Sequence, residues 1–260
     1  MEPIVETRAT PGHKRGRLFQ AGKRLRRWVN RIIATHSKVG DPPVFAPELF
    51  PWVPVLEQGW PAIKADLEAL LAKPDAIPTF HAVSPDQKRI SHGTQWRSFF
   101  LWGFGYRITG NCERCPDTAA VLEQIPGLVT AFFSILAPGA HIPPHRGVTK
   151  RIVNCHLALM VPRQASQPED RCRMLVDDQV VTWEPGKCVV FDDTYQHAVW
   201  NPTQEMRVVL LLQVKRPIRQ PGRFLGDLFL WLVRRSPYVQ DARRNLARWE
   251  NAQHKLEKEY

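Results

Sequence analysis

The pattern of apolar and polar residues changes character near the middle of the chain. Between residues 128 and 217, short apolar runs alternate with turn residues, which is typical of antiparallel strands. The runs that predict strands are 129–136, 152–161, 172–176, 179–183, 187–191 and 208–214. Asp177-Asp178 separates two of these runs in the manner of a hairpin turn. Many short strands joined by Gly and Pro turns predict a mainly β fold, here a double-stranded β-helix or jelly roll.

The stretch before residue 128 is more mixed. Residues 40–60 are rich in proline and aromatic residues, which predicts an extended segment leading into the core. Apolar residues at helical spacing then predict a helix from Trp60 to Leu71. The aromatic run 96–106 predicts one or two buried strands, and a short helix is expected over 118–124.

Both ends of the chain show helical patterns. Residues 1–34 combine apolar residues at helical spacing with many basic residues, and 224–235 is a short apolar helix that ends in Arg234-Arg235. A last polar helix is expected from Asp241 onward. Each terminal helix has two open interpretations: packing on the domain, or lying on an anionic membrane surface. The predicted organisation is a basic arm over 1–40, a strand-rich domain over 41–217 and C-terminal helices over 218–260.

Composition narrows the class of protein. A chain of 260 residues with 43% hydrophobic residues suits one globular domain with flanking arms. The net charge of +11 favours anionic partners: membrane, phosphorylated substrate or nucleic acid. No recognition motif accompanies the basic arm, so the pattern favours the other anionic partners over nucleic acid. No apolar run approaches the length needed to span a bilayer, and Met1-Glu2-Pro3 opens no signal peptide.

The five cysteines are few and odd in number, which argues against a disulfide framework and favours a reducing, cytoplasmic environment. Cys112 and Cys115 form a Cys-x-x-Cys pair, but no second pair follows at zinc-ribbon spacing. A turn leading into the 118–124 helix is the favoured interpretation of this pair.

Two histidines lie at the ends of predicted strands. His145 follows a double proline, and His197 comes shortly after Asp192-Asp193 at the end of another strand. Iron oxygenases place two histidines and a carboxylate on one face of a barrel and leave coordination positions open. The carboxylate would fall two residues after the first histidine, where this chain has Gly147. Taken alone, the pair is a weak signal.

An arginine provides the second signal. Arg207 opens the apolar strand that ends near Val214. Because an unpaired buried charge is costly, the guanidinium requires an anionic partner. Either a protein carboxylate such as Glu205 or the terminal carboxylate of 2-oxoglutarate would satisfy it.

These motifs together resemble the aspartyl/asparaginyl β-hydroxylases, a family of iron(II)- and 2-oxoglutarate-dependent dioxygenases with a double-stranded β-helix fold. The resemblance covers roughly 45–217, and this family also has Gly in place of the usual carboxylate. The residues that carry it are Ser134, Pro144-His145-Arg146-Gly147, His156-Leu157-Ala158-Leu159, Trp183-Glu184-Pro185-Gly186-Lys187, 191–200 and Arg207.

The resemblance implies a role for each matching residue. His145 and His197 would bind Fe(II), and Asp193 would hydrogen-bond a metal-bound water. Ser134 and Arg207 would hold the distal carboxylate of 2-oxoglutarate, and His156 would contact its chelating end.

One matching position departs from the family pattern. The family often has an arginine two residues before His156, where this chain has Asn154. Arg151 is the nearby candidate to replace it.

The resemblance also implies the reaction: O2 and 2-oxoglutarate are consumed, succinate is released, and an unactivated carbon gains a hydroxyl group. Some members resemble lipid A acyl-chain hydroxylases at the cytoplasmic face of the bacterial inner membrane, and the basic and apolar arms favour such a peripheral, lipid-directed protein. Hydroxylation of Asp or Asn in a peptide, or of a free or carrier-bound amino acid, is the alternative. A non-catalytic, cupin-like barrel that binds metal through His145, His156 and His197 is the alternative of another class.

Overall fold

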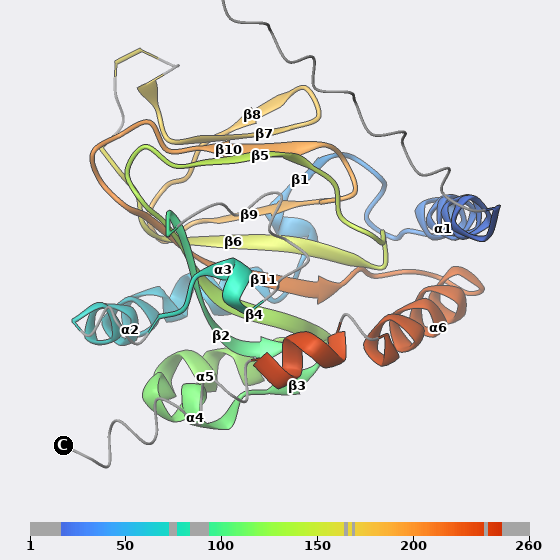
Figure 1. Ribbon diagram of the computed structural model, residues 1–260, viewed down its shortest axis with the longest axis horizontal. Helices are drawn as coiled ribbons and strands as arrows, with labels where there is room; N and C mark the ends of the chain where they lie inside the picture. Colours follow the sequence, from blue (N-terminus) through green and yellow to red (C-terminus); the bar gives the residue numbers. More distant parts are fainter. Residues whose placement is uncertain are drawn as a thin grey trace, which may run out of the picture.

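The fold consists of two antiparallel sheets that face each other, with helices on the outside of the larger sheet and at one end (Figure 1). The computed structural model describes residues 17–72, 77–83, 94–163, 166–167, 170–236 and 239–245. The strands are β1 (Val44–Phe45), β2 (Trp96–Gly103), β3 (Tyr106–Arg107), β4 (Leu128–Leu136), β5 (His141–His145), β6 (Ile152–Met160), β7 (Arg173–Val176), β8 (Gln179–Val181), β9 (Cys188–Phe191), β10 (His197–Trp200) and β11 (Arg207–Lys215).

The larger sheet has the strand order β1-β9-β6-β11-β4-β2-β3, and the smaller has the order β5-β10-β7-β8. Neighbours in space are mostly distant in sequence, as jelly-roll connections require. The central strand β11 pairs with β4 on one side and with β6 on the other, over almost its whole length. Its run of Val and Leu suits a position covered on both faces.

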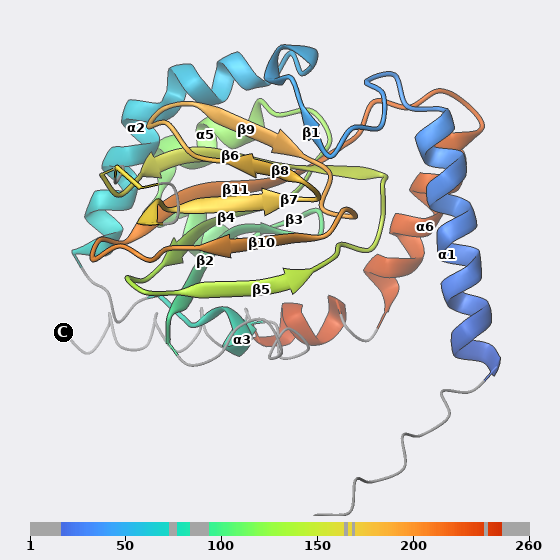
Figure 2. The same cartoon turned by 90° about the horizontal axis from the view of Figure 1, so that it is seen from above.

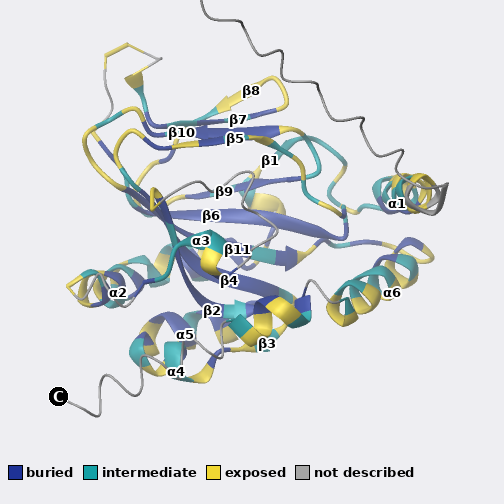
Figure 3. Cartoon of the chain, in the orientation of Figure 1, coloured by how far each residue is buried: buried dark blue, intermediate teal, exposed yellow. Residues whose placement is uncertain are grey.

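The helices are α1 (Arg17–Thr35), α2 (Val53–Leu71), α3 (Phe80–Val83), α4 (Thr109–Arg114), α5 (Pro116–Glu123) and α6 (Gly222–Arg235), with a 3-10 turn η1 (Pro47–Leu49). Of these, α2, α4 and α5 cover the outer face of the larger sheet. The main hydrophobic core lies between α2, α5 and the sheet. A second core lies between the two sheets, around residues such as Trp96, Met174 and Val209. Figure 3 shows this burial along the strands.

The two long terminal helices, α1 and α6, lie side by side at one end of the sandwich (Figure 2). Val29 and Ile33 of α1 pack with Ile218 and with Phe229 of α6. Within the part of the chain that the structure describes, no helix is both long enough and apolar enough to cross a bilayer.

The predicted jelly roll and its strands are confirmed, including the 173–181 hairpin, in which Asp177 takes a left-handed conformation with φ 57°. The N-terminal and 224–235 helices are also present as α1 and α6. Residues 239–245 are helical, and the remainder of the predicted last helix lies outside the described residues.

Two local predictions were wrong. The helix expected from Trp60 already begins at Val53, because Pro54 lies in the first turn, where its missing N–H leaves no intrahelical bond unmade. The turn expected at the Cys-x-x-Cys pair is the short helix α4, in which Cys112 is buried against β2.

Candidate active site

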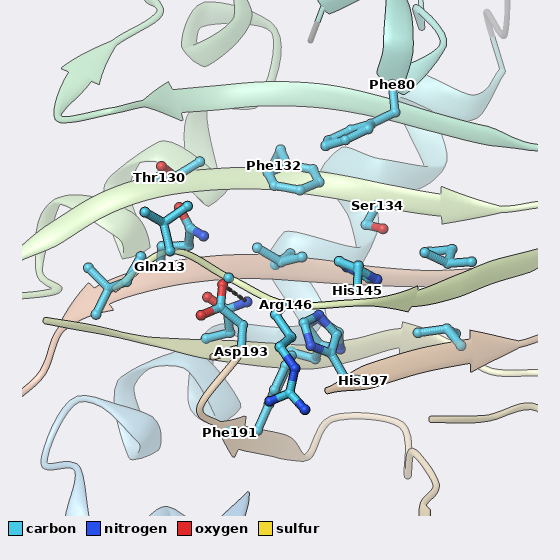
Figure 4. Close-up of a pocket in the computed structure, with 18 of the residues that line it drawn as sticks. Phe80, Thr130, Phe132, Ser134, His145, Arg146, Phe191, Asp193, His197 and Gln213 are labelled. Carbon is cyan, nitrogen blue, oxygen red and sulfur yellow. Dashed lines mark hydrogen bonds between the residues drawn. The ribbon is translucent and has the colours of Figure 1, made fainter. Parts of the chain in front are cut away.

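His145 and His197 lie opposite each other on the smaller sheet. They are cross-strand partners in the β5–β10 pair, and their ring centroids are 4.0 Å apart. Both project into the space between the sheets (Figure 4). Strand pairing therefore brings together two residues that are 52 positions apart in sequence, as the sequence predicted.

Each ring of this pair is oriented by the backbone. Nδ1 of His145 lies 2.9 Å from the carbonyl oxygen of Pro143, and Nδ1 of His197 lies 3.0 Å from that of Tyr195. With the proton on Nδ1, each Nε2 presents its lone pair to the cavity, which is the form a metal ligand needs. Burial lowers the pKa of both rings, and His145 adds to the effect at His197, whose pKa is about 4. Both imidazoles are therefore neutral at physiological pH.

A glycine and a carboxylate complete this end of the site. The Gly147 N–H donates to the backbone carbonyl of Asp193 at 2.6 Å. A Cβ atom on residue 147 would collide with the Asp193 carboxylate. The carboxylate of Asp193 thus fills the space where a side chain at 147 would stand. It is held by Asn154, whose Nδ2 donates to Oδ2 at 3.3 Å, and Oδ1 has no protein partner.

Burial, and next the charge of Asp192, raise the pKa of Asp193 to about 7. A carboxyl group with such a pKa exchanges a proton readily near neutral pH, so it suits hydrogen bonding to a water in either direction. The role that the family resemblance implies for Asp193, hydrogen bonding to a metal-bound water, stays a prediction.

The larger sheet contributes the other polar residues. Val209 pairs with Ser134 on one side and with Ala158 on the other. Because side chains two residues apart point to the same face, Arg207 and Ser134 both face the space between the sheets, and His156 does likewise from β6. All three line the same cavity as the histidine pair.

Arg207 is a fully buried cation whose guanidinium has unpaired atoms. It is 1% exposed, and neither Nε nor Nη1 has a hydrogen-bond partner. Burial lowers its pKa to about 10, which leaves it charged at neutral pH, and Cys172 offers it a weak side-chain contact. The guanidinium also lies 4.8 Å from the ring centre of Trp183. The salt bridge to Glu205 that was the alternative is absent among the described residues. An anionic ligand would satisfy this group.

His156 and Ser134 lie beside Arg207 on the larger sheet, and the three residues form a polar wall of the cavity. Neither ring nitrogen of His156 has a partner, and burial, followed by the charge of Arg207, lowers its pKa well below the usual range. The Ser134 hydroxyl accepts a hydrogen bond from Nε1 of Trp96 at 3.1 Å, which fixes its lone pairs and leaves its proton free for a ligand. His156 does not join the histidine pair in a three-residue metal cluster; none with three such side chains occurs among the described residues.

Arg151 is the one predicted site residue that the structure takes elsewhere. Its guanidinium donates to the backbone carbonyl of Arg216 at 2.7 Å and to Asp227 of α6 at 3.0 Å. The reason is the alternation of side chains along a strand. Asn154 and His156 face the cavity, so Arg151, three residues before Asn154, points to the opposite face.

A buried ion network supports the turn that carries Asp193 and His197. Arg216 pairs with Asp192 at 2.8 Å and with Asp41 at 3.1 Å, and Lys150 bridges the same two carboxylates. Asp192 also accepts bonds from the N–H and hydroxyl of Thr194. Such a network fixes the chain direction between β9 and β10.

Sequence reasoning missed Asn154 as a contact of Asp193 and Trp96 as the partner of Ser134. It also missed Gln213, which pairs with Asn154 across the β6–β11 ladder and lines the cavity. Strand alternation alone could have placed Asn154 beside His156.

The cavity has a volume of about 660 Å³ and joins this polar wall to an apolar region. Phe80 stacks on Trp96 at 3.9 Å, and Phe100 stacks on Phe132 at 4.4 Å between ring centres. The apolar lining continues through Val129 and Leu211 to Leu230 and Val233 of α6. The cavity therefore has a polar, charged end and an apolar end.

The fold and the site together define a class of protein. It is a double-stranded β-helix, or jelly roll, with a ligand site between its sheets, formed by a neutral histidine pair and a buried arginine with unpaired atoms. Comparison with known proteins is more specific. A family model described as aspartyl/asparaginyl beta-hydroxylase matches residues 57–217. The chain belongs to this hydroxylase family.

Named relatives differ in substrate. An ornithine lipid ester-linked acyl 2-hydroxylase of Rhizobium tropici is 40% identical over 223 residues, covering 86% of this chain and 78% of that protein. The human aspartyl/asparaginyl beta-hydroxylase is 28% identical over 219 residues, covering 81% of this chain but only 26% of that protein.

Proposed function

We propose that the protein is an Fe(II)- and 2-oxoglutarate-dependent hydroxylase that acts on an acyl chain of a polar membrane lipid. The observation that carries the proposal is the cavity, which has a histidine pair and an unpaired arginine at one end and an apolar lining beyond.

The chemistry of the side chains fits the metal and the co-substrate. His145 and His197 offer two neutral nitrogens that would hold Fe(II), and the metal would supply activation of O2 coupled to decarboxylation of the co-substrate. Arg207 and Ser134 would hold the distal carboxylate of 2-oxoglutarate, because a guanidinium and a hydroxyl donate to carboxylate oxygens. His156, with both nitrogens unpaired, would contact the other end.

Asp193 would supply the acidic group that Gly147 lacks, by holding a water rather than the metal itself. With Asn154 fixing one oxygen, its free Oδ1 would orient a water beside the histidine pair.

The apolar lining favours an acyl chain over the polar side chain of a peptide. Phe132, Leu211 and Val233 offer no charged group to a carboxylate or amide beyond the polar wall. The 40% identity to an acyl 2-hydroxylase of a lipid supports the same choice. The substrate class is thus an ester- or amide-linked acyl chain on a polar lipid such as lipid A or an amino-acid-containing lipid. The peptide substrate remains the alternative, favoured by the more distant human relative.

The test is turnover by the purified full chain with Fe(II) and 2-oxoglutarate. Bacterial lipid extracts and Asp- or Asn-containing peptides are offered in parallel, and succinate and products heavier by one oxygen are measured. We expect lipid products, and background succinate in His145→Ala and His197→Ala. Oxygen addition to peptides alone would overturn the lipid assignment, and wild-type succinate in both variants would overturn the metal assignment.

A further inference from the structure

The exposed apolar side chains of the protein are concentrated on α1 and α6. Ten large hydrophobic residues are exposed in the described part of the chain, and six of them lie on these two helices. The six are Leu25 and Trp28 of α1, and Phe224, Leu228, Trp231 and Leu232 of α6. Exposed apolar patches on a soluble face mark sites of interaction. These six residues are called the end patch below.

The two helices present the end patch to one side. On α1, Val29 and Ile33 pack against α6, whereas Asn30 bonds to the 148–150 segment of the domain. At 3.6 residues per turn, Trp28 follows on the flank of Val29 that is opposite to Asn30, away from the domain.

The same reasoning applies to α6. Phe229 packs towards α1, and Gly226 lies against Arg151 of the domain. Helical spacing then places Leu228 and Leu232 on the flank of Phe229 opposite to Gly226. Trp28 of α1 and Leu228 and Leu232 of α6 therefore border the α1–α6 contact on its outer side, where the two helices lie alongside each other (Figure 2).

Positive charge surrounds the end patch. Helix α1 carries six basic residues and no acidic one. Helix α6 adds Arg223 and Arg235, and Arg235 lies 3.7 Å from the ring centre of Trp231, whereas Arg234 packs on the ring of Tyr106. The acidic residue of α6, Asp227, is held by Arg151 and Lys215. Apolar side chains flanked by arginines and by tryptophan are the composition of a helix that lies on an anionic bilayer.

The cavity reaches the same end of the molecule. Leu230 and Val233 line it from the inner face of α6. Val148 lines it from the opposite side, is 48% exposed, and accepts a bond from Asn30 of α1 through its backbone carbonyl. One helix thus bears the end patch on its outer face and a wall of the cavity on its inner face.

We propose that α1 and α6 together dock the protein on an anionic lipid bilayer through the end patch. A lipid acyl chain would then enter the cavity between α6 and the 146–149 segment without crossing bulk water. The entry route rests on the proposed lipid hydroxylase function, whereas the docking does not. This location corresponds to the peripheral, membrane-surface position that the sequence suggested.

Docking is tested by sedimentation of the full chain with vesicles of phosphatidylglycerol mixed with phosphatidylcholine, and with phosphatidylcholine alone. We expect binding only to the anionic vesicles, weakened by salt. The triple variant Arg24→Gln, Arg27→Gln, Arg31→Gln should bind on the order of a hundredfold more weakly, at about fivefold per arginine. The double variant Trp28→Ser, Trp231→Ser should lose about tenfold or more.

The matched control is Leu49→Ser, Val180→Ser, which removes two exposed apolar side chains outside the end patch and should bind like wild type. Equal loss in this control, or no binding of the wild type to anionic vesicles, would overturn the proposal. Dimers of wild type that the tryptophan variant abolishes, without vesicle binding, would identify a second copy as the occupant. Tighter binding to duplex DNA than to vesicles at equal salt would point to nucleic acid instead.

Activity separates docking from catalysis. The tryptophan variant should turn over lipid in detergent micelles at the wild-type rate, and lipid in vesicles at least tenfold more slowly. Vesicle binding without any hydroxylation would retain the docking and reject the proposed function. Equal slowing in micelles and vesicles would reject docking as the cause.

Discussion

The carboxylate of Asp193 occupies the space into which a side chain at Gly147 would project. The two residues are also joined through the backbone, since the Gly147 N–H donates to the Asp193 carbonyl oxygen. The chain therefore keeps an acidic group at this end of the cavity but supplies it from the neighbouring segment between β9 and β10. The glycine at 147 is a steric requirement of that arrangement.

Gly147→Ala should destabilise the fold by about 1–3 kcal/mol, because the added methyl group collides with a buried carboxylate that cannot move freely. The free energy of unfolding in urea measures the effect. Gly22→Ala is the control, since nothing lies within 4 Å of a Cβ at that position. A neutral result for Gly147→Ala would mean that the Asp193 side chain rearranges at little cost.

Exchanging the residues at positions 147 and 193 tests the same relationship through metal binding and turnover. Gly147→Asp alone should lose Fe(II) affinity and turnover, because two carboxylates compete for one space. The double variant Gly147→Asp, Asp193→Gly relieves the collision and should recover metal affinity at least tenfold relative to the single variant. Metal titration by calorimetry reports this directly. Additive losses in the double variant would contradict the exchange.

Arg207→Met should stabilise the empty protein by about 1–3 kcal/mol while abolishing 2-oxoglutarate binding, because it removes a buried charge with unpaired atoms. Unfolding free energy and 2-oxoglutarate titration give the two readouts. Arg207→Lys keeps the charge but cannot form two parallel hydrogen bonds to a carboxylate, and should raise the KM for 2-oxoglutarate at least tenfold. A destabilised Arg207→Met protein with unchanged co-substrate binding would mean that the guanidinium serves the fold.

The strands of the jelly roll could be predicted because their alternation and their turns are local properties of the sequence. The start of α2 could not, since Pro54 is favourable in a first helical turn but reads as a helix breaker out of context. The packing of α1 against α6 joins residues about 200 positions apart, and no local pattern encodes it.

In the site, too, some features follow from the local sequence and others only from the fold. His145 and His197 stand out in the sequence as a weak signal at predicted strand ends, and the family resemblance makes them candidate metal ligands. Their contact depends on the β5–β10 register. The unpaired state of Arg207 could not be read from the sequence, because it depends on which carboxylates the fold brings near. The side on which Arg151 lies follows from the sequence, since strand parity relative to Asn154 sets its face.

Arg151→Gln should lower stability by about 1–3 kcal/mol and leave the KM for 2-oxoglutarate unchanged, because its guanidinium holds Asp227 and a backbone carbonyl outside the cavity. Urea unfolding and succinate kinetics separate the two effects. Arg223→Gln is the control: this exposed arginine lies 3.9 Å from the same carboxylate and should contribute less than about 1 kcal/mol. A tenfold rise in KM would restore Arg151 to the co-substrate site.

Alkaline pH should destabilise the protein through its buried thiols. Burial, and next the charge of Asp66, raise the pKa of Cys115 from an ordinary value of 9.0 to about 12. Because the folded state disfavours the thiolate, the contribution of Cys115 is fully present below pH 9 and is lost as the pH rises towards 12. Between pH 9 and 10 the unfolding free energy should therefore fall more steeply in wild type than in Cys115→Ala, by up to about 1.4 kcal/mol per pH unit.

All five cysteines are buried, so a thiol reagent should label the native protein only at the rate at which the fold opens. Parallel stability curves for the two proteins would show that Cys115 is accessible to water, and rapid labelling of the native state would show that at least one of the five thiols is.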